Sequence, residues 1–583
     1  MYSIYKKRGY DVRFNTKKTQ GKKVYYYYHE SYRQKISPEA RGKAKGSGQS
    51  RVINISHYLG TAKDIYKKYK NFDEPVSVAH RNFGVIAAAY QTAREIGLID
   101  ILKKHIPGNR FGDDNWLYFL FPILNRLDHA TSKNQMSIWL SKTILPALLN
   151  FDIKNFNSKK FWYVTDDVIS EKEVKQADDD LFKGVDVEVF NKIEEELFQN
   201  IAKQFKLSDN VFFYDTTNFY TYIEEPARSR LAKTGHNKDS KHHLKQVGLL
   251  MAVESNFGIP FLHKIYRGNS HDTKTFYEVV AELILRLKQI CKTDSDIILV
   301  LDKGNNSKDN FAQLAGNVSW IGSLTPSHHE ELIDIELTDY TKKLGDTKYF
   351  RTSKKVMGHE CVIIVTFNEK LKRKQEYTFQ RNTKKVKEKV IEKWNRYKRK
   401  PKKVVPKGIL SILKDCTYGK YITPQINDGE IKFNYKDNET TKRKKYFGKN
   451  IIFSNLSNAK SENIITTYRD KNKIEDDNKL LKDKDIICFN PIRHWTDSKI
   501  RAYAFCCVMS MTLLKIMQLK ADLNGYKMSA RVLMEELRDL KEIIMIYSHK
   551  RAKRLISHQS TVQSALWDIF KMEEVKKITT IHN

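Results

Sequence analysis

Four polar residues share one side of a predicted helix in the last quarter of the sequence. The stretch YRDKNKIEDDNKLLK (468–482) places Tyr468, Lys471, Glu475 and Lys482 within an arc of roughly 60° at about 100° per residue, opposite its apolar residues. A phenol, a carboxylate and two ammonium groups on one stripe have the chemistry to hold a cation and to contact phosphate. A solvated helix face has the same composition, so the stripe alone leaves both interpretations open.

Two aspartates follow apolar runs that are typical of buried β-strands. Asp215 comes after Val-Phe-Phe-Tyr (211–214), and Asp302 comes after Ile-Ile-Leu-Val-Leu (297–301). A carboxylate at this point is costly to bury alone, so each aspartate needs a cation or several hydrogen-bond donors. Either residue could instead cap a helix or stabilise a turn. If the two strands are neighbours in one sheet, however, the carboxylates converge, and Glu475 would join them from a helix packed on that sheet.

Three converging carboxylates would form a site for a hard divalent cation. Oxygen ligands suit Mg²⁺ or Mn²⁺, and the six cysteines show no Cys-x-x-Cys spacing that would indicate zinc. Two such ions roughly 3.5–4 Å apart would activate a nucleophilic oxygen and stabilise the leaving oxygen of a phosphodiester. We therefore predict that Asp215, Asp302 and Glu475 are catalytic and bind two Mg²⁺ ions, for which Mn²⁺ can substitute. The predicted DNA-binding residues beside them are Tyr468, Lys471 and Lys482.

The whole chain is strongly basic. Its 583 residues include 104 Lys and Arg against 69 Asp and Glu, a net charge of +35, which favours a polyanionic partner, most simply nucleic acid. Ribosome-like and membrane-surface proteins are also basic, but they are seldom this long or this rich in core residues. No signal-peptide pattern is present, and the longest apolar run, 502–514, is too short to cross a bilayer. No GxxxxGK[ST] loop is present either, so we predict neither membrane association nor ATP dependence.

The elements that would position these residues divide the chain into six regions. Hydrophobic periodicity predicts helices over 77–208 and the order β-β-β-α-β-α-β over 209–335. A segment with seventeen Lys and Arg against three acids, 370–407, interrupts this pattern, and strand-like pieces flank it. The predicted regions are a basic N-terminal region with DNA contact (1–76), a helical domain that binds DNA ends (77–208), the first part of an α/β catalytic core (209–335), a basic β-rich insertion (336–458), the final helix of the core (459–492) and a helical C-terminal region suited to dimerisation (493–583).

Together these motifs resemble the insertion-sequence-four family of bacterial DDE transposases. The spacing Tyr468-x2-Lys471-x3-Glu475-x6-Lys482 is similar to the Y-x2-R-x3-E-x6-K signature of that family. The stretches YDTTNFY, GHNKDSKHHLKQVGLLM, GIPFLHKIYRGNSHDTKTF and LDKGNNSKDNFAQL are similar to its long-transposase branch. The resemblance covers roughly residues 80–540.

The resemblance implies an α/β fold with a ribonuclease-H-like mixed sheet as catalytic core, and helical N-terminal and C-terminal regions. A mainly β insertion would occupy the 172 residues between Asp302 and Glu475. Asp215, Asp302 and Glu475 would bind the metal ions. The enzyme would cleave at transposon ends, expose 3′ hydroxyls and join them to target DNA in cut-and-paste transposition.

The resemblance also implies partners and a location. It implies a homodimer in a synaptic complex with double-stranded DNA, both terminal inverted repeats and target DNA. The location would be the bacterial cytosol, with the protein on the nucleoid when bound to DNA. Two alternatives remain open: a catalytically silent DNA-binding relative, and a ribonuclease-H-like nuclease without strand transfer.

Two features of the resemblance concern individual residues. The family's arginine is Lys471 here, which keeps the charge but loses the planar, bidentate grip on phosphate. Arg469 could supply that contact, although it lies about 100° from Tyr468 around the helix. In related enzymes a tryptophan of the insertion holds a flipped base during hairpin formation, and Trp394 is the only tryptophan deep in this insertion. A core or surface role is the alternative for Trp394.

Overall fold

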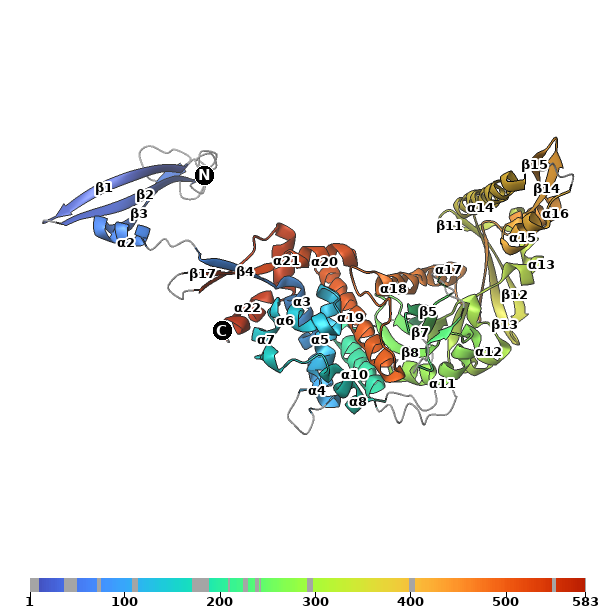
Figure 1. The fold of residues 1–583 in the computed structure, drawn as a ribbon, viewed down its shortest axis with the longest axis horizontal. Coiled ribbons are helices and arrows are strands. Elements are labelled where there is room, and N and C mark those ends of the chain that lie inside the picture. The colour runs from blue at the N-terminus through green and yellow to red at the C-terminus, as the bar shows by residue number, and fades with distance from the viewer. Residues whose placement is uncertain are drawn as a thin grey trace. The chain divides into compact units, whose positions relative to one another are not determined.

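The computed structural model describes most of the chain (Figure 1). The described residues are 10–21, 23–35, 50–70, 75–106, 108, 114–169, 188–207, 210–223, 229–235, 241, 243–290, 297–397, 404–547 and 552–581. The chain forms two compact units, Met1–His80 with Glu542–Ser557 and Arg81–Lys541 with His558–Asn583. All of the predicted catalytic residues lie in the second unit.

The first unit contains a three-stranded antiparallel sheet. Its elements in chain order are β1 (Tyr10–Gln20), β2 (Lys23–Lys35), β3 (Ser50–Thr61) and α2 (Ala62–Lys70). The strands pair in the order β1-β2-β3, and α2 packs against β2 and β3. Tyrosines of β2 contact aromatic residues of β3, as Tyr27 does with Tyr58 at 5.3 Å between ring centroids. The basic N-terminal region is therefore a small β-sheet domain, and its contact with DNA stays a prediction.

A second small sheet corrects the expectation that residues 77–208 and the C-terminal region are wholly helical. Strand β17 (Lys541–Ile546) pairs with β18 (Ala552–Ile556) and with β4 (Ser77–Asn82). The preceding helix, α20 (Ala530–Arg538), ends before this strand begins. The segment KEIIMI (541–546) is rich in β-branched isoleucine, which favours a strand over a continued helix.

The helices of the second unit surround one long core helix, α19 (Asp497–Leu523). By length and composition α19 could cross a membrane, but 83% of its most apolar stretch is buried inside the protein, as in the core helix of a globular domain. The apolar run 502–514 lies inside this helix. The other main helices of this part are α3 (Gly84–Glu95), α4 (Leu98–His105), α5 (Leu117–Asp128), α8 (Lys160–Val168), α10 (Glu188–Phe205), α21 (Thr561–Ile569) and α22 (Met572–Ile581).

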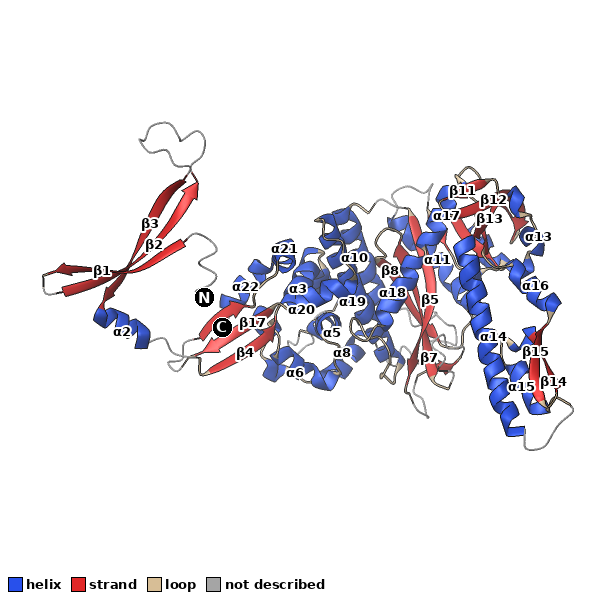
Figure 2. Ribbon diagram, turned by 90° about the horizontal axis from the view of Figure 1, so that it is seen from above, coloured by secondary structure: helices blue, strands red, loops and turns tan. Residues whose placement is uncertain are grey.

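A large mixed sheet runs through the second unit (Figure 2). Its first elements are β5 (Val211–Thr221), the two-residue β6 (Lys233–Thr234), β7 (Lys245–Glu254), β8 (Pro260–Arg267), α11 (Asp272–Ile290), β9 (Ile298–Val300), α12 (Lys308–Leu314) and β10 (Ser319–Leu324). Apart from β6, this is the predicted order β-β-β-α-β-α-β. The strands lie in the order β8-β7-β5-β9-β10; β5, β9 and β10 are parallel to one another, and β7 pairs antiparallel with both β5 and β8. This mixed α/β arrangement is consistent with a ribonuclease-H-like core.

The insertion extends the same sheet with antiparallel strands. Beyond β10 the sheet continues with β16 (Lys449–Ser454), β13 (His359–Asn368), β12 (Thr347–Val356) and β11 (Lys342–Leu344). The remaining elements of the insertion are α14 (Glu369–Tyr397), α15 (Lys407–Asp415), the hairpin of β14 (Ile422–Asn427) and β15 (Glu430–Tyr435), and α16 (Asp437–Lys445).

The prediction of a mainly β insertion is therefore wrong for its most basic stretch, which forms the long helix α14. Lysine, arginine and glutamate favour helix over strand. The buried residues of α14 recur at helical spacing and line one face; they are Phe379, Thr383, Val386, Val390 and Trp394. Figure 2 shows α14 beside α15 and the β14–β15 hairpin, on which it packs.

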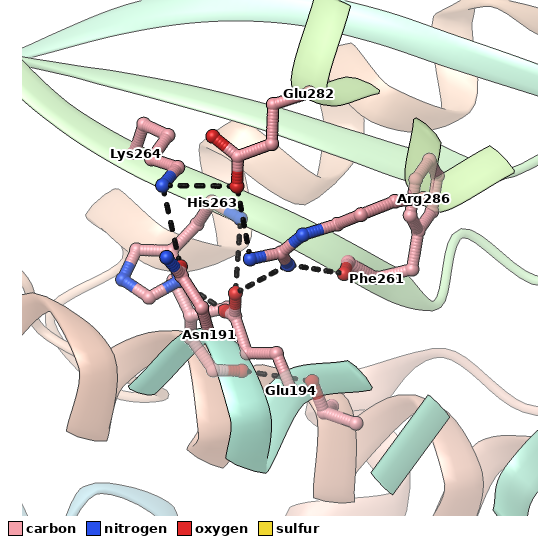
Figure 3. Close-up of polar contacts among 9 residues, drawn as sticks. Asn191, Glu194, Phe261, His263, Lys264, Glu282 and Arg286 are labelled. Atoms are coloured by element: carbon pink, nitrogen blue, oxygen red, sulfur yellow. Dashed lines mark hydrogen bonds and ion pairs between the residues drawn. The ribbon is translucent and has the colours of Figure 1, made fainter. Parts of the chain in front are cut away.

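A buried cluster of charges joins α10 to the sheet and to α11 (Figure 3). Glu194 of α10 pairs with His263 of β8 and with Arg286 of α11, whose Nη1 lies 3.3 Å from Glu194 Oε2. Glu282 Oε1 lies 3.1 Å from Arg286 Nη2 and 3.1 Å from Lys264 Nζ. Burial alone would raise the pKa of Glu194, but His263 and Arg286 hold that pKa below its ordinary value. The cluster fixes a helix of the helical domain to the sheet that carries the predicted catalytic residues.

Candidate active site

Asp215 and Asp302 lie at the same level on neighbouring parallel strands. Strands β5 and β9 pair through Phe213 opposite Val300, and each aspartate comes two residues after this pair. Because adjacent strands are about 4.8 Å apart, the two aspartates stand side by side where β9 ends. The two strands are therefore neighbours, which is the condition that the sequence sets for the two carboxylates to converge. Asp215 lies within its strand, which continues to Thr221, whereas Asp302 follows the end of β9.

The carboxylate of Asp302 does not act as a helix cap. Asp302 occupies the N-terminal cap position of a short 3-10 turn, Lys303–Asn305, but its side chain accepts no capping hydrogen bond from that turn. Its Oδ1 instead lies 3.9 Å from Nζ of Lys471. The helix-capping alternative for Asp302 therefore does not describe this side chain.

The helix that carries the polar stripe is broken in two at Lys471. Helix α17 (Ser461–Asp470) ends and α18 (Asn472–Lys482) begins on either side of this residue. The backbone N–H of Lys471 donates to the carbonyl of Tyr468, and the N–H of Ile474 donates to the carbonyl of Lys471 at 3.1 Å. These three-residue hydrogen bonds tighten the chain locally. The sequence predicts one continuous helix here, and the structure has two.

Helix α18 covers the face of β5 that carries Asp215 (Figure 1). Successive side chains of a strand point to opposite faces of the sheet. Tyr214 contacts Phe276 of α11 at 4.8 Å between ring centroids, whereas Asp215 accepts a hydrogen bond from Asn478 of α18 at 2.9 Å. Helices α11 and α18 therefore lie on opposite faces, and α18, which carries Glu475, lies on the face of Asp215.

Lys471 links the three predicted ligands electrostatically. The residue is only 5% exposed, and its Nζ lies 3.1 Å from Glu475 Oε1 and 3.9 Å from Asp302 Oδ1. Burial alone would lower the pKa of Lys471, but the attraction of Asp302, and then of Asp215, raises that pKa above its ordinary value. The ammonium group is thus held in its charged form among the acids and not on the protein surface.

Tyr468 reaches the same site from α17. Its hydroxyl forms a hydrogen bond with the side chain of Ser323 in β10. Burial raises the pKa of Tyr468, and the nearby Asp302 and Glu475 raise it further against the opposing effects of Ser323 and Lys471. The phenol therefore stays protonated near neutral pH.

Asn478 is the residue of this site that sequence reasoning missed. It is 8% exposed, and its Nδ2 donates to Asp215 Oδ2 at 2.9 Å. It lies three residues after Glu475, so the helical spacing that aligned the polar stripe also places Asn478 on the neighbouring surface of α18. That spacing was the signal available in the sequence.

The opposite side of α18 is held by a fully buried carboxylate. Asp477 pairs with Lys515 of α19, and burial raises the pKa of Asp477 to about 7 against the lowering effect of that lysine. Gly258, in the turn between β7 and β8, has a φ of +71°, and a Cβ at this position would lie 2.4 Å from Asp477 Oδ2. The turn thus approaches α18 more closely than any other residue type permits. These contacts fix α18 on the side of Asp477, and Glu475 lies on the opposite side of the helix.

The chemistry of this site suits a divalent cation. Its carboxylates are hard oxygen ligands, and the buried ammonium of Lys471 already provides a positive charge among them. Within the part of the chain that the structure describes, no three acidic, histidine or cysteine side chains stand close enough to hold one ion together. Because Lys471 lies between Glu475 and Asp302, it must move aside before these two carboxylates can share a metal ion.

Two other predicted DNA-binding residues differ in their positions. Lys482 ends α18, and its Nζ lies 5.6 Å from the ring centroid of Phe219, on the same strand as Asp215. Arg469 donates a hydrogen bond to Thr347 of β12. Arg469 therefore points to the extended part of the sheet and does not replace Lys471 beside the acids.

Trp394 lies in the core of the insertion. It is 3% exposed and packs with Val390, Ile409, Leu413 and Ile422, from α14, α15 and β14. In this conformation its ring has no face available to a flipped base. The structure therefore favours the core role that the sequence left as the alternative.

This chain is similar to known proteins in structure and not in sequence. No protein-family model matches this chain, and no curated protein sequence matches it. Among solved structures, the chain is similar to one described as a cryo-EM structure of the piggyBac transposase synaptic complex with hairpin DNA. That similarity has a TM-score of 0.38 and 10% sequence identity, and covers 79% of this chain and 82% of the other.

Proposed function

We propose that this protein is a DDE transposase of the insertion-sequence-four type, with a ribonuclease-H-like catalytic core. The observation that carries the proposal is the gathering of Asp215, Asp302 and Glu475 around Lys471 where β9 ends. The strand order β8-β7-β5-β9-β10 supports the same core. Lys471 is buried among these acids, and a buried charge contributes little to stability compared with apolar packing, which favours a chemical role for this group.

The three acids are proposed to hold two Mg²⁺ ions, for which Mn²⁺ can substitute. When bound, such ions would activate the attacking oxygen and stabilise the leaving oxygen of a phosphodiester. The chain's own elements position the residues that would hold these ions. Strands β5 and β9 position the aspartates, and α18 positions Glu475. Once Lys471 moves off the carboxylates, its ammonium is placed to contact a phosphate oxygen of the bound strand.

The proposed partner is double-stranded DNA, both the terminal inverted repeats of a transposon and the target, bound by a homodimer in a synaptic complex. The net charge of +35 supports a polyanionic partner. Exposed cations line the side of α14 that faces away from its buried residues; among them are Lys374, Arg381, Lys384 and Lys385. We expect binding that weakens steeply with salt, as phosphate contacts do. The expected location is the bacterial cytosol, and we expect no ATP and no membrane to be required.

The test is Mg²⁺-dependent cleavage of the element's own terminal repeats. Glu475→Gln keeps the side-chain shape but removes the charge, so we expect cleavage to fall by roughly 100-fold or more. Asp476→Asn is the matched control, because Asp476 is exposed on the same turn and pairs with Lys479 at 2.7 Å. It should cleave like the wild type. Equal cleavage by Glu475→Gln and the wild type would refute the proposed enzyme.

Strand joining separates the proposal from its alternatives. A transposase joins the cleaved 3′ ends to a second duplex, and that product is measured on a gel with a labelled target. Cleavage without joining would leave a ribonuclease-H-like nuclease. DNA binding that is indifferent to divalent metal, with no nicking, would leave a catalytically silent relative.

A further inference from the structure

We propose that Asn478 is a positioning residue that fixes the carboxylate of Asp215 for divalent-metal binding, an inference that rests on the metal site proposed above. Asn478 is 8% exposed, and its Nδ2 lies 2.9 Å from Asp215 Oδ2. An amide donates only through its nitrogen, and its oxygen would be repelled by a carboxylate, so this contact sets the orientation of the amide. The bond to an ionised acceptor is of the stronger, charge-assisted kind.

Through the contact between Asn478 and Asp215, helix α18 positions two proposed ligands, Asp215 and Glu475. Glu475 precedes Asn478 by three residues, so both side chains leave α18 on neighbouring surfaces. The backbone of Asp215 is fixed by its pairing with Met251 in β7, and its carboxylate is fixed from α18. The amide therefore holds Asp215 in register with Glu475, although the two ligands belong to different elements of the fold.

The oxygen of the Asn478 amide argues against a purely structural role for this residue. Oδ1 of Asn478 is buried and has no hydrogen-bond partner among the described residues. A buried acceptor left without a partner is destabilising, and an apolar side chain of similar size would avoid that loss. The advantage of asparagine over such an apolar side chain is its hydrogen bond to Asp215. Partners of this kind, which orient a metal-binding carboxylate, typically change metal affinity by about 10–100-fold.

The experiment is a calorimetric titration of Mn²⁺ into the full-length protein without DNA. Asn478→Leu keeps the volume and removes the donor, and Asn478→Ala does so without risk of overpacking. Both are expected to weaken Mn²⁺ binding by about 10–100-fold. Asn472→Ala is the matched control, because Asn472 is an exposed asparagine in the first turn of the same helix. It should bind Mn²⁺ like the wild type.

Asp215→Asn separates failure of this inference from failure of the proposed function. If Asp215→Asn loses Mn²⁺ binding while both Asn478 variants bind Mn²⁺ like the wild type, the positioning role is wrong and the metal site stands. If Asp215→Asn binds Mn²⁺ unchanged, the proposed metal site is wrong, and the positioning role is wrong with it.

Cleavage measured against Mg²⁺ concentration gives an independent readout. A positioning role predicts that Asn478→Ala raises the half-saturating Mg²⁺ concentration by about 10–100-fold and leaves the rate at saturating Mg²⁺ within about threefold of the wild type. A general loss of folded protein would lower the saturating rate and leave the half-saturating concentration unchanged. That second pattern would overturn the inference.

Discussion

Lys471 and Glu475 form an ion pair across one helical turn, with Nζ 3.1 Å from Oε1, although the lysine is buried and the glutamate is half exposed. The same ammonium lies 3.9 Å from Oδ1 of Asp302. One lysine thus partly neutralises two proposed metal ligands that come from a helix and a strand. A lysine ammonium and a divalent ion cannot occupy the same space. The ion pairs of Lys471 and the binding of a divalent ion to these carboxylates should therefore compete.

The first prediction concerns Lys471→Met, which removes the ammonium and keeps much of the side-chain volume. Without divalent ions the variant should unfold at a lower temperature than the wild type, because Asp302 and Glu475 lose their counter-ion. Mn²⁺ should then raise the unfolding temperature of the variant by more than it raises that of the wild type, since binding to the folded state stabilises it. The measurement is thermal unfolding with and without Mn²⁺, in the absence of DNA.

Lys479→Met is the control for this prediction. Lys479 is exposed on the same helix and pairs with Asp476 instead of a proposed ligand. Its response to Mn²⁺ should equal that of the wild type. A response of Lys471→Met no larger than that of Lys479→Met would show that the ammonium and the metal ion do not compete.

The second prediction concerns the buried cluster of Figure 3. Glu194→Gln leaves Arg286 and His263 without the carboxylate that they face, so the free energy of unfolding should fall by about 3–5 kcal/mol. The control is Glu196→Gln on the same helix, a partly exposed carboxylate that pairs with the largely exposed Lys104 and with His105, and the expected change is at most about 1 kcal/mol. Urea unfolding measures both. Equal destabilisation by the two variants would mean that the cluster does not join α10 to the sheet.

The third prediction is a pH dependence that comes from Lys133. Burial, with repulsion from Lys499, lowers the pKa of Lys133 from 10.5 to about 8, and its Nζ lies 4.2 Å from the ring centroid of Trp162. Between these two pH values the folded protein binds fewer protons than the unfolded chain. This residue therefore makes the protein more stable as the pH rises through that window, by at most about 1.4 kcal/mol per pH unit.

Lys133→Met should remove this contribution. Thermal unfolding of the wild type and the variant at pH 8, 9 and 10 would show the difference in stability between them shifting in favour of the wild type as the pH rises. A difference that stays constant across the three values would show that Lys133 keeps its ordinary pKa in the folded state.

The fourth prediction separates the two roles of Trp394. In a core role, Trp394→Ala should destabilise the insertion by about 3–5 kcal/mol and make it sensitive to limited proteolysis. Trp495→Ala, at a tryptophan that is 62% exposed, should change the stability little. If Trp394→Ala instead keeps wild-type resistance to protease and slows only the excision of DNA, the residue acts on DNA and not in the core.

Some elements of the fold can be predicted from the sequence, and others cannot. Helix α19 lies in the region predicted to be helical (493–583), and the order of strands and helices from β5 to β10 is as expected, because long apolar runs specify these elements locally. The sequence predicts β-structure for the stretch that forms the long helix α14, because strand-like pieces flank it, and it predicts helix for the region that contains the strand β17. In both cases local propensity and the packing of one face decided the outcome.

The sequence by itself determined which residues have the chemistry: Asp215, Asp302 and Glu475 as hard ligands, with Lys471 at helical spacing from the last of them. It did so because apolar runs and helical periodicity are local properties of the chain. Only the tertiary structure decided that β5 and β9 are neighbours, that the helix breaks at Lys471 and that its ammonium lies between the carboxylates. It also decided that Asn478 holds Asp215. These relationships depend on which elements pack together, and that is settled by burial over the whole fold and not by spacing along the sequence.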